Sequence, residues 1–220
     1  TYSMIGTYHF YIWANDTAGN ITTSSVYTFE IEGDVEPPKI KNVVDYPDPQ
    51  WQYGSVEISC VVTDNEGVDL VKVHITYPDS STINATMTKS GGKYRYSAVY
   101  TEPGTYSYYI WARDINGNGN KSSTYTFTIL QDTVPPSTHV HIYGEEGNNG
   151  WYKSSVEIEL HATDTGSGVD KTYYKIDDSP WYIYTGPFEI SEQGIHTLYY
   201  YSIDKVGNHE STHSKTIKID

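Results

Sequence analysis

Acidic side chains recur at corresponding places in two long stretches of this sequence. The first stretch carries Asp34, Glu36, Asp64, Asp69 and Asp114, and the second carries Asp132, Asp164, Asp170 and Asp204. Most stand where a segment with strand-like alternation begins or ends, so we expect each set to gather at one pole of a β-sandwich. Several carboxylates together are what a hard cation such as Ca²⁺ requires. The pattern therefore indicates a candidate calcium site at each junction, where the ion would stiffen the hinge.

The same aspartates also have a purely local interpretation. An Asp in a turn accepts hydrogen bonds from the backbone a few residues on, and so stabilises that turn alone. Residues 114–119, Asp-Ile-Asn-Gly-Asn-Gly, match the first half, D-x-[DN]-x-[DN]-G, of a continuous calcium loop, but Tyr125 stands where that loop requires its bidentate Glu, so the sequence contains no complete loop. Its absence favours turn capping over calcium binding.

Tryptophan and tyrosine side chains indicate a different chemistry. Tyr109 and Trp111 alternate outward on one predicted strand, and Trp151 and Trp181 stand in later segments. Exposed rings of this kind mark ligand surfaces, so Trp111, Trp151 and Trp181 form a candidate carbohydrate platform. The alternative is that these rings flank a sheet edge or pack against long side chains, because lone surface aromatics are common.

Four triplets match the acceptor sequence for N-linked glycosylation. Their asparagines are Asn15, Asn20, Asn84 and Asn120. The triplet is short and often arises by chance, but Asn20 and Asn120 lie in or beside a predicted turn, where exposure is expected. All four remain candidate modification sites.

Residue types used in catalysis are present without forming a recognisable site. His139 and His141 share one strand face, and His209 lies near His213, but neither pair has a third ligand at metal spacing. The letters H-E-x-x-H occur once, as His209-Glu210-Ser211-Thr212-His213, but the motif binds metal only on a helix and no segment here has a sustained helical period. A nucleophile elbow and a phosphate-binding glycine loop are absent. The sequence does not predict an enzyme.

Composition limits the structures and partners to consider. The 220 residues include 23 tyrosines, and aromatic residues favour strands. A formal net charge of −14 argues against nucleic acid and anionic membranes as partners. No apolar run of about 18 residues is present to insert into a bilayer. The single cysteine, Cys60, cannot form a disulfide within the chain and alternates with apolar neighbours, so we expect it to be buried.

A long segment occurs twice and shows that the chain is built from repeats. Residues 104–129 read as a strand, a Gly/Asn turn and a second strand, residues 6–31 carry nearly the same text, and a looser copy begins at Gly194. Two linkers ending in Pro-Pro divide the chain into 1–32, 33–131 and 132–220. Because 1–32 holds only two predicted strands, 7–14 and 25–31, we interpret it as the C-terminal hairpin of a truncated repeat.

Short alternating segments fill the two longer parts. In 33–131 the predicted strands are 39–45, 55–63, 70–77, 83–88, 94–100, 105–112 and 124–130. In 132–220 the later predicted strands are 172–176, 182–184, 188–190, 196–202 and 214–219. Seven short strands with turn residues every 8 to 12 positions, roughly, predict an all-β fold of tandem immunoglobulin-like β-sandwiches.

One tyrosine has the spacing of a tyrosine corner. Tyr106 is placed so that its hydroxyl can bond to backbone upstream, and Tyr108 then points inward, where antibody domains have a cysteine. Tyr8 has the same position in the first hairpin. The last repeat has His196 there, so the sequence does not predict a tyrosine corner for it.

The last repeat resembles a known class of modules. The residues that carry the resemblance are Asn148-Asn149-Gly150-Trp151-Tyr152, Ala162-Thr163-Asp164, Gly166-Ser167-Gly168-Val169, Thr185-Gly186-Pro187-Phe188 and Asp204-Lys205-Val206-Gly207-Asn208. They are similar to the fibronectin-III-like and bacterial Ig-like repeats of bacterial and archaeal surface proteins and secreted hydrolases. Residues 33–131 resemble a sister type more loosely.

This resemblance implies a noncatalytic structural or spacer module of an extracellular or cell-surface protein, supporting adhesion or surface assembly. Two alternatives stay open: carbohydrate-binding accessory domains of a secreted hydrolase, and a filament or surface-layer subunit that exchanges strands between chains. The expected partners are neighbouring Ig-like domains, other copies of the chain or surface glycans. Calcium is the one candidate cofactor.

Overall fold

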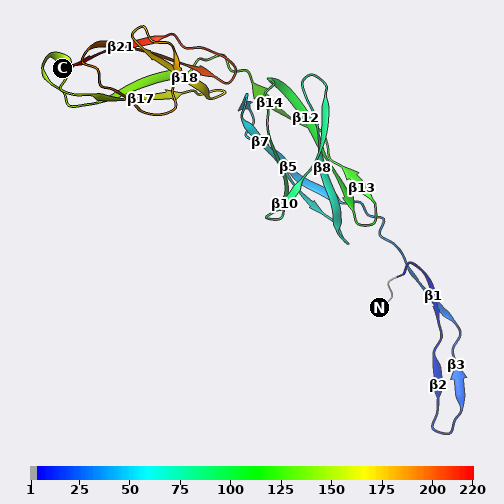
Figure 1. The fold of residues 1–220 in the computed structure, drawn as a ribbon. Helices are drawn as coiled ribbons and strands as arrows, with labels where there is room; N and C mark the ends of the chain where they lie inside the picture. Colours follow the sequence, from blue (N-terminus) through cyan, green and yellow to red (C-terminus); the bar gives the residue numbers. More distant parts are fainter. Residues whose placement is uncertain (1–3) are drawn as a thin grey trace.

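The computed structural model describes residues 4–220, and nearly all of their regular structure is β. Three parts follow one another along an extended chain: a hairpin arm (residues 4–32), a middle sandwich (39–130) and a C-terminal sandwich (137–219) (Figure 1). None of the helical structure in residues 4–220 is long and apolar enough to cross a membrane.

The middle sandwich consists of two packed sheets. One sheet contains, in spatial order, β10 (Thr88–Ser90), β11 (Lys93–Val99), β7 (Ser55–Thr63) and β5 (Lys39–Tyr46). The other contains β6 (Gln50–Trp51), β14 (Tyr125–Leu130), β12 (Gly104–Asp114), β8 (Val68–Thr76) and β9 (Thr82–Thr86), with β13 (Gly119–Lys121) beside β12. The first sheet corresponds to immunoglobulin strands A-B-E-D, and the second to C-F-G with β9 added beside C. The predicted immunoglobulin-like sandwich is therefore confirmed.

Side chains at every second position of the strands fill the core between these sheets. Val56, Ile58 and Cys60 on β7 are fully buried and face Tyr108 and Ile110 on β12 within one apolar cluster. Burial raises the pKa of the Cys60 thiol to about 11. The expected burial of Cys60 is therefore confirmed.

The C-terminal sandwich repeats this plan on a smaller scale. Its first sheet contains β15 (Ser137–Tyr143), β17 (Val156–Thr163) and β20 (Phe188–Ile190). Its second contains β16 (Trp151–Tyr152), β22 (His213–Ile219), β21 (Gly194–Asp204), β18 (Val169–Ile176) and β19 (Tyr182–Ile183), and a short 3₁₀ turn, η1 (Asn148–Gly150), precedes β16. Val156, Ile158, Leu198 and Ile217 form a separate core.

One strand prediction is wrong in a way that shows how the sandwich closes. Residues 83–88 were expected to form a single strand, but β9 and β10 lie in different sheets. The chain crosses between the sheets at Met87, whose side chain is buried and whose N–H donates to Val71 O. The short strands β6, β13 and β16 were not predicted, because two or three residues carry too little alternation to detect.

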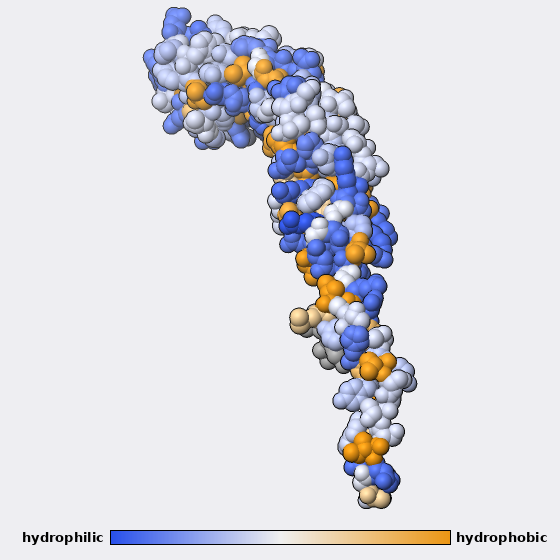
Figure 2. All heavy atoms as spheres, turned by 90° about the vertical axis from the view of Figure 1, so that its right-hand side faces the viewer, coloured by the Kyte–Doolittle hydropathy of each residue, from blue (hydrophilic) through white to orange (hydrophobic). Residues whose placement is uncertain are grey.

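The hairpin arm repeats β12–β14 without the sheets that cover it. β1 (Gly6–Phe10) pairs with β4 (Tyr27–Ile31), and β2 (Trp13–Asn15) pairs with β3 (Ile21–Thr23). The predicted strand 7–14 is therefore interrupted, whereas the predicted strand 25–31 is present as β4, and β3 was not predicted. Phe10 and Ile12 are 44% and 61% exposed, whereas Tyr108 and Ile110, at the same positions of the repeat, are 1% and 0% exposed. Hydrophobic atoms lie on the surface of the arm (Figure 2).

Candidate cation site at the junctions

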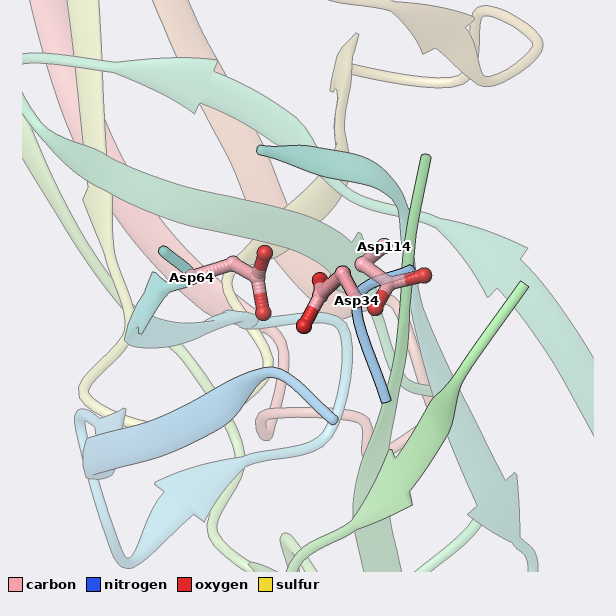
Figure 3. Close-up of side chains that lie close together, drawn as sticks. All are labelled: Asp34, Asp64 and Asp114. Atoms are coloured by element: carbon pink, nitrogen blue, oxygen red, sulfur yellow. The ribbon is translucent and has the colours of Figure 1, made fainter. Parts of the chain in front are cut away.

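Three carboxylates meet at the end of the middle sandwich nearest the hairpin arm. Asp64 follows β7, Asp114 ends β12, and Asp34 belongs to the linker that leads into β5. One oxygen from each lies within 4.8 Å of the others, and the three side chains lie close together in Figure 3. The predicted gathering at one pole is confirmed for these three residues.

The C-terminal sandwich builds the same arrangement. Asp132 in the second linker, Asp164 after β17 and Asp204 at the end of β21 also place one oxygen each within 4.8 Å of the others. Asp114, Asp132 and Asp204 are buried. Two unit charges about 4 Å apart repel each other by about 4 kcal/mol at an effective dielectric constant of about 20, so each cluster favours the uptake of positive charge.

The other three candidate ligands lie outside the clusters, and each has a basic partner. The Asp69 carboxylate accepts from Arg113 Nη2 at 2.6 Å. Lys39 Nζ lies 3.4 Å from the Glu36 carboxylate, and Lys171 Nζ lies 3.2 Å from that of Asp170. All three are exposed or half-exposed ion pairs, which contribute little to stability.

Asp114 and Asp204 each hold a tight turn. Asp114 Oδ1 accepts from the N–H groups of Asn116 and Asn118 at 2.9 and 2.8 Å, and Oδ2 accepts from Asn118 Nδ2 at 2.8 Å. Asp204 makes the equivalent bonds with the residues of its own turn. Gly117 has φ +97°, a left-handed conformation that favours glycine. The turn-capping interpretation is therefore confirmed for these two aspartates.

Asp64 and Asp164 cap their turns with only one oxygen. Asp64 Oδ1 accepts from the N–H groups of Glu66 and Gly67, both at 3.0 Å. Asp164 Oδ2 accepts from those of Gly166 and Gly168 at 3.0 and 2.7 Å. The second oxygen of each, Asp64 Oδ2 and Asp164 Oδ1, is buried and has no hydrogen-bond donor. A buried carboxylate oxygen without a donor is costly, and turn capping does not account for it.

Hydrogen bonds lower the pKa of the two linker aspartates. Asn65 Nδ2 donates to Asp34 Oδ1 at 3.0 Å, and this bond is the main reason that the pKa of Asp34 lies below its ordinary value. Burial acts against ionisation of Asp132, but the bonds from the N–H groups of Ser167 and Val134 outweigh it and lower its pKa. Both carboxylates are available as anions at neutral pH.

Asp132 also connects the two sandwiches. Its N–H donates to Gln52 Oε1 at 3.1 Å, and Gln52 Nε2 donates to Thr101 O in the middle sandwich at 2.8 Å. On the other side its carboxylate accepts from Ser167 N–H at 2.6 Å in the C-terminal sandwich. Sequence reasoning did not identify Gln52, because the repeat has Tyr152 at the matching position and gives no signal there.

The three tryptophans of the proposed carbohydrate platform lie on different surfaces. Trp111, on β12, packs against Gly119, where an added Cβ would lie 3.5 Å from the indole. Trp151 pairs with Lys218 at the far end of the C-terminal sandwich. Trp181 is 41% exposed and meets Tyr201 edge to face at 4.8 Å. The described structure does not bring the three rings together.

The four candidate glycosylation sites differ in what their side chains do. Asn20 Nδ2 donates to Asp16 Oδ2 at 2.8 Å, and Asn120 Nδ2 donates to Pro38 O at 2.7 Å. Asn15 and Asn84 are exposed, and neither uses its amide nitrogen in a hydrogen bond with residues 4–220. Two of the four asparagines therefore have structural roles.

The tyrosine corner is present, and histidine reproduces its bond in the last repeat. Tyr106 donates its hydroxyl to Glu102 O at 2.9 Å, and Tyr8 donates to Met4 O at 2.8 Å. In the C-terminal sandwich His196 Nε2 lies 2.9 Å from Glu192 O. His196 is therefore the equivalent of Tyr106, which the sequence did not predict.

Comparisons with known proteins find similarity to solved structures only. No family model matches the sequence, and no curated protein matches it significantly. Similar solved structures include fibronectin(III)-like modules of Clostridium thermocellum CbhA, at 14% identity and TM-score 0.32, over 83% of this chain and 94% of that one. A tetra-tandem repeat from the extending region of a large adhesion protein matches at 16% identity and TM-score 0.35, over 97% of this chain and 56% of that one. A chimeric titin Z1Z2 matches at 10% identity and TM-score 0.44, over 83% and 96%. The immunoglobulin-like assignment itself follows from the strand order and the two cores.

Proposed function

We propose that this chain is a noncatalytic spacer of an extracellular or cell-surface protein, which supports adhesion or surface assembly by holding a functional part at a distance. The observation that carries the proposal is the arrangement at the second junction, where Asp132 bonds to both sandwiches at once. A linker held from both sides limits rotation between its neighbours. Such a junction transmits position along an extended chain, which is the mechanical task of a spacer (Figure 1).

We further propose that Ca²⁺ completes each junction. Each cluster offers three ionised or ionisable carboxylates, and one of them contributes a buried oxygen that lacks a donor, Asp64 Oδ2 or Asp164 Oδ1. Ca²⁺ takes oxygen ligands in flexible geometry and would neutralise the repulsion among the carboxylates. Because each linker aspartate lies across from two sandwich aspartates, the ion would join linker to sandwich.

The experiment measures thermal unfolding and solution dimensions of the 220-residue chain with CaCl₂ and with a chelator. A ligand at 100 times its Kd stabilises the native state by about 2.7 kcal/mol, which corresponds to a rise in Tm of roughly 10 to 20 °C for a domain of this size. Small-angle scattering should show a narrower distribution of maximum dimensions with calcium. Equal midpoints and equal scattering with calcium and with chelator would remove the cation from the proposal.

We also propose that the hairpin arm is the closing hairpin of another sandwich of the same type. The apolar face of β12–β14 is buried by β5, β7 and β11, and the same face of the arm is exposed. A chain in which residues 33–103 are fused ahead of residue 6 supplies such strands. Hydrogen exchange of β1 and β4 should then slow to the rate seen in β12 and β14.

The alternative, strand exchange between copies, is supported by the same exposed face and makes a different prediction. Light scattering of the unfused chain should then show a dimer or larger assembly that depends on concentration. A monomer at all concentrations, together with slowed exchange in the fusion, supports a closing hairpin. Unchanged exchange in the fusion contradicts it.

A further inference from the structure

Two Asn-x-Ser/Thr triplets lie in the middle sandwich, and of their two asparagines only Asn84 has an amide nitrogen that makes no hydrogen bond within residues 4–220. Asn84 is exposed on β9, the last strand of its sheet, so no further strand of residues 4–220 lies beside it. Its Oδ1 accepts from His74 Nδ1 at 3.0 Å. The oxygen is held in this way while the amide nitrogen stays without a hydrogen bond in residues 4–220, and Thr86 is exposed on the same face of the strand.

Asn120 provides the contrast within the same sandwich. Its side chain is half-buried, Nδ2 donates to Pro38 O at 2.7 Å, and Oδ1 accepts from Lys121 N–H at 2.8 Å. These bonds tie β13 to the segment that begins β5. A sugar on this nitrogen would have to displace that segment.

Aromatic and polar side chains lie beside Asn84 on the same sheet, where they could contact a sugar ring. His74 lies directly opposite Asn84 in the sheet register, and Tyr109 lies opposite His74. The rings of His74 and Tyr109 stack at 4.7 Å, and Lys121 Nζ lies 3.7 Å from the centre of the Tyr109 ring. Aromatic edges and polar hydrogens thus continue from Asn84 across three neighbouring strands.

We propose that Asn84 is an acceptor site for an N-linked oligosaccharide, a modification that rests on the extracellular location in the proposed function. The donor is an oligosaccharide carried on a lipid pyrophosphate, the class of substrate that transferases of the secretory route use. The Asn84 amide nitrogen attacks the anomeric carbon and loses one proton. A C–N bond forms, the bond from the sugar to the pyrophosphate oxygen breaks, and the lipid pyrophosphate leaves, with no change in oxidation state.

The test is to secrete the 220-residue chain from insect cells and map each triplet. Treatment with N-glycosidase in heavy-oxygen water converts a modified Asn into a labelled carboxylate, which peptide mass spectrometry locates. The expected result is label on the peptide that contains Asn84 and none on the peptide that contains Asn120. Thr86→Ala removes the triplet but leaves the bond between His74 and Asn84, so its sandwich should fold and lose the label. Thr86→Ser should keep it.

An unlabelled Asn84 in the folded, secreted chain overturns the proposal, and so does label that persists in Thr86→Ala. Protein made in bacterial cytoplasm carries no such sugar, and the calcium and scattering experiments use that material. Failure of the spacer proposal and failure of the glycosylation proposal are therefore separate results.

Discussion

Asn118 donates its side-chain Nδ2 to the main-chain oxygen of Asp34 at 3.0 Å, which fastens the turn after β12 to the linker that enters the same sandwich. Asn208 makes the equivalent bond to Asp132 O at 3.3 Å. Each asparagine also donates to the aspartate of its own turn, at 2.8 and 2.7 Å. The sequence Asp-x-x-Gly-Asn is therefore both a turn and an anchor for the preceding linker.

Replacing this anchor should weaken the sandwich to which it belongs. Asn118→Ala removes the bond to Asp34 O and the bond to Asp114 Oδ2, both partly buried. We expect the free energy of unfolding of the middle sandwich to fall by about 1 to 3 kcal/mol in urea titrations. The matched control is Asn20→Ala in the hairpin arm, which has the same turn but anchors no linker among residues 4–220. Equal stability of Asn118→Ala and the parent chain would contradict the anchoring role.

Neutralising one carboxylate of each cluster should abolish any effect of calcium without breaking the turn. In Asp64→Asn and Asp164→Asn the amide oxygen can still accept the backbone bonds that the aspartate now accepts. The charge that a cation needs is lost, so Tm should become equal with CaCl₂ and with chelator. Without calcium the variants should be as stable as the parent chain or more so, because repulsion among the carboxylates decreases.

Asp69→Asn is the control for these two variants, since Asp69 pairs with Arg113 outside the cluster. Its calcium response should match that of the parent chain. A loss of the response in Asp69→Asn would mean that the ion binds elsewhere.

Gly166 is required by the close approach of Asp132. An added Cβ at residue 166 would lie 2.3 Å from Asp132 Cγ and 2.4 Å from its Oδ2, far inside van der Waals contact. Gly166→Ala should therefore displace the linker carboxylate and destabilise the C-terminal sandwich by about 1 to 3 kcal/mol. Calorimetry of the chain should show a lower Tm for unfolding of the C-terminal sandwich and an unchanged Tm for the middle sandwich. Gly166 has no left-handed φ, so its substitution tests the clash alone, whereas Gly207→Ala, at φ +92° with no atom near its Cβ, tests backbone strain alone.

The sequence was sufficient to predict the fold class and much of each aspartate cluster, for a physical reason. Inward residues such as Ile58 and Ile110 alternate strictly along their strands, so the pattern shows which faces meet. Two strands that end at the same pole bring Asp64 and Asp114 together whatever the details of packing. Because the sequence is repeated, the same arrangement of strands and aspartates had to fit both sandwiches, which strengthened the predictions of the fold and of the clusters.

What could not be predicted depends on contacts between unlike segments. Gln52 accepts the N–H of Asp132 at the end of the middle sandwich opposite to the Asp34 cluster. No spacing in the sequence relates Gln52 to Asp132. Arg113 pairs with Asp69 because the two residues are neighbours across the paired strands β8 and β12. Alternation of polar and apolar residues does not determine the register of these strands. The ion pairs of Glu36 and Asp170 are likewise consequences of local geometry.

The last prediction concerns His196, whose two ring nitrogens both face acceptors. Nδ1 lies 2.8 Å from Asp177 Oδ2, and Nε2 lies 2.9 Å from Glu192 O, so only the protonated ring can donate at both ends. The bond with Asp177 is the main reason that the pKa of His196 is raised, and burial opposes it. Asp177 also accepts from Thr197 N–H at 2.6 Å, and its pKa is lowered by these bonds against the effect of its own burial. The charged groups that face the ring are Asp177 and Glu192.

Because the folded-state pKa of His196 lies above the unfolded value near 6.5, its contribution to stability is fully present below pH 6.5 and is lost as the pH rises through the folded-state value. The Asp177 contribution has the opposite sense: it is present above pH 3.8 and is lost as the pH falls. The C-terminal sandwich should therefore lose about 1 kcal/mol of unfolding free energy between pH 5.5 and pH 8.5, a modest amount because the Asp177 side chain is 45% exposed and solvent screens the pair.

The variant His196→Tyr tests this pH dependence. It introduces the residue type that the middle sandwich has at this position, which can still donate to Glu192 O but does not titrate in this range. Hydrogen exchange of β21 and β22, compared between the two chains across this pH range, isolates the histidine from other titrating groups. If both chains change equally with pH, the ring is not protonated in the folded state and the corner is held by Nε2 alone.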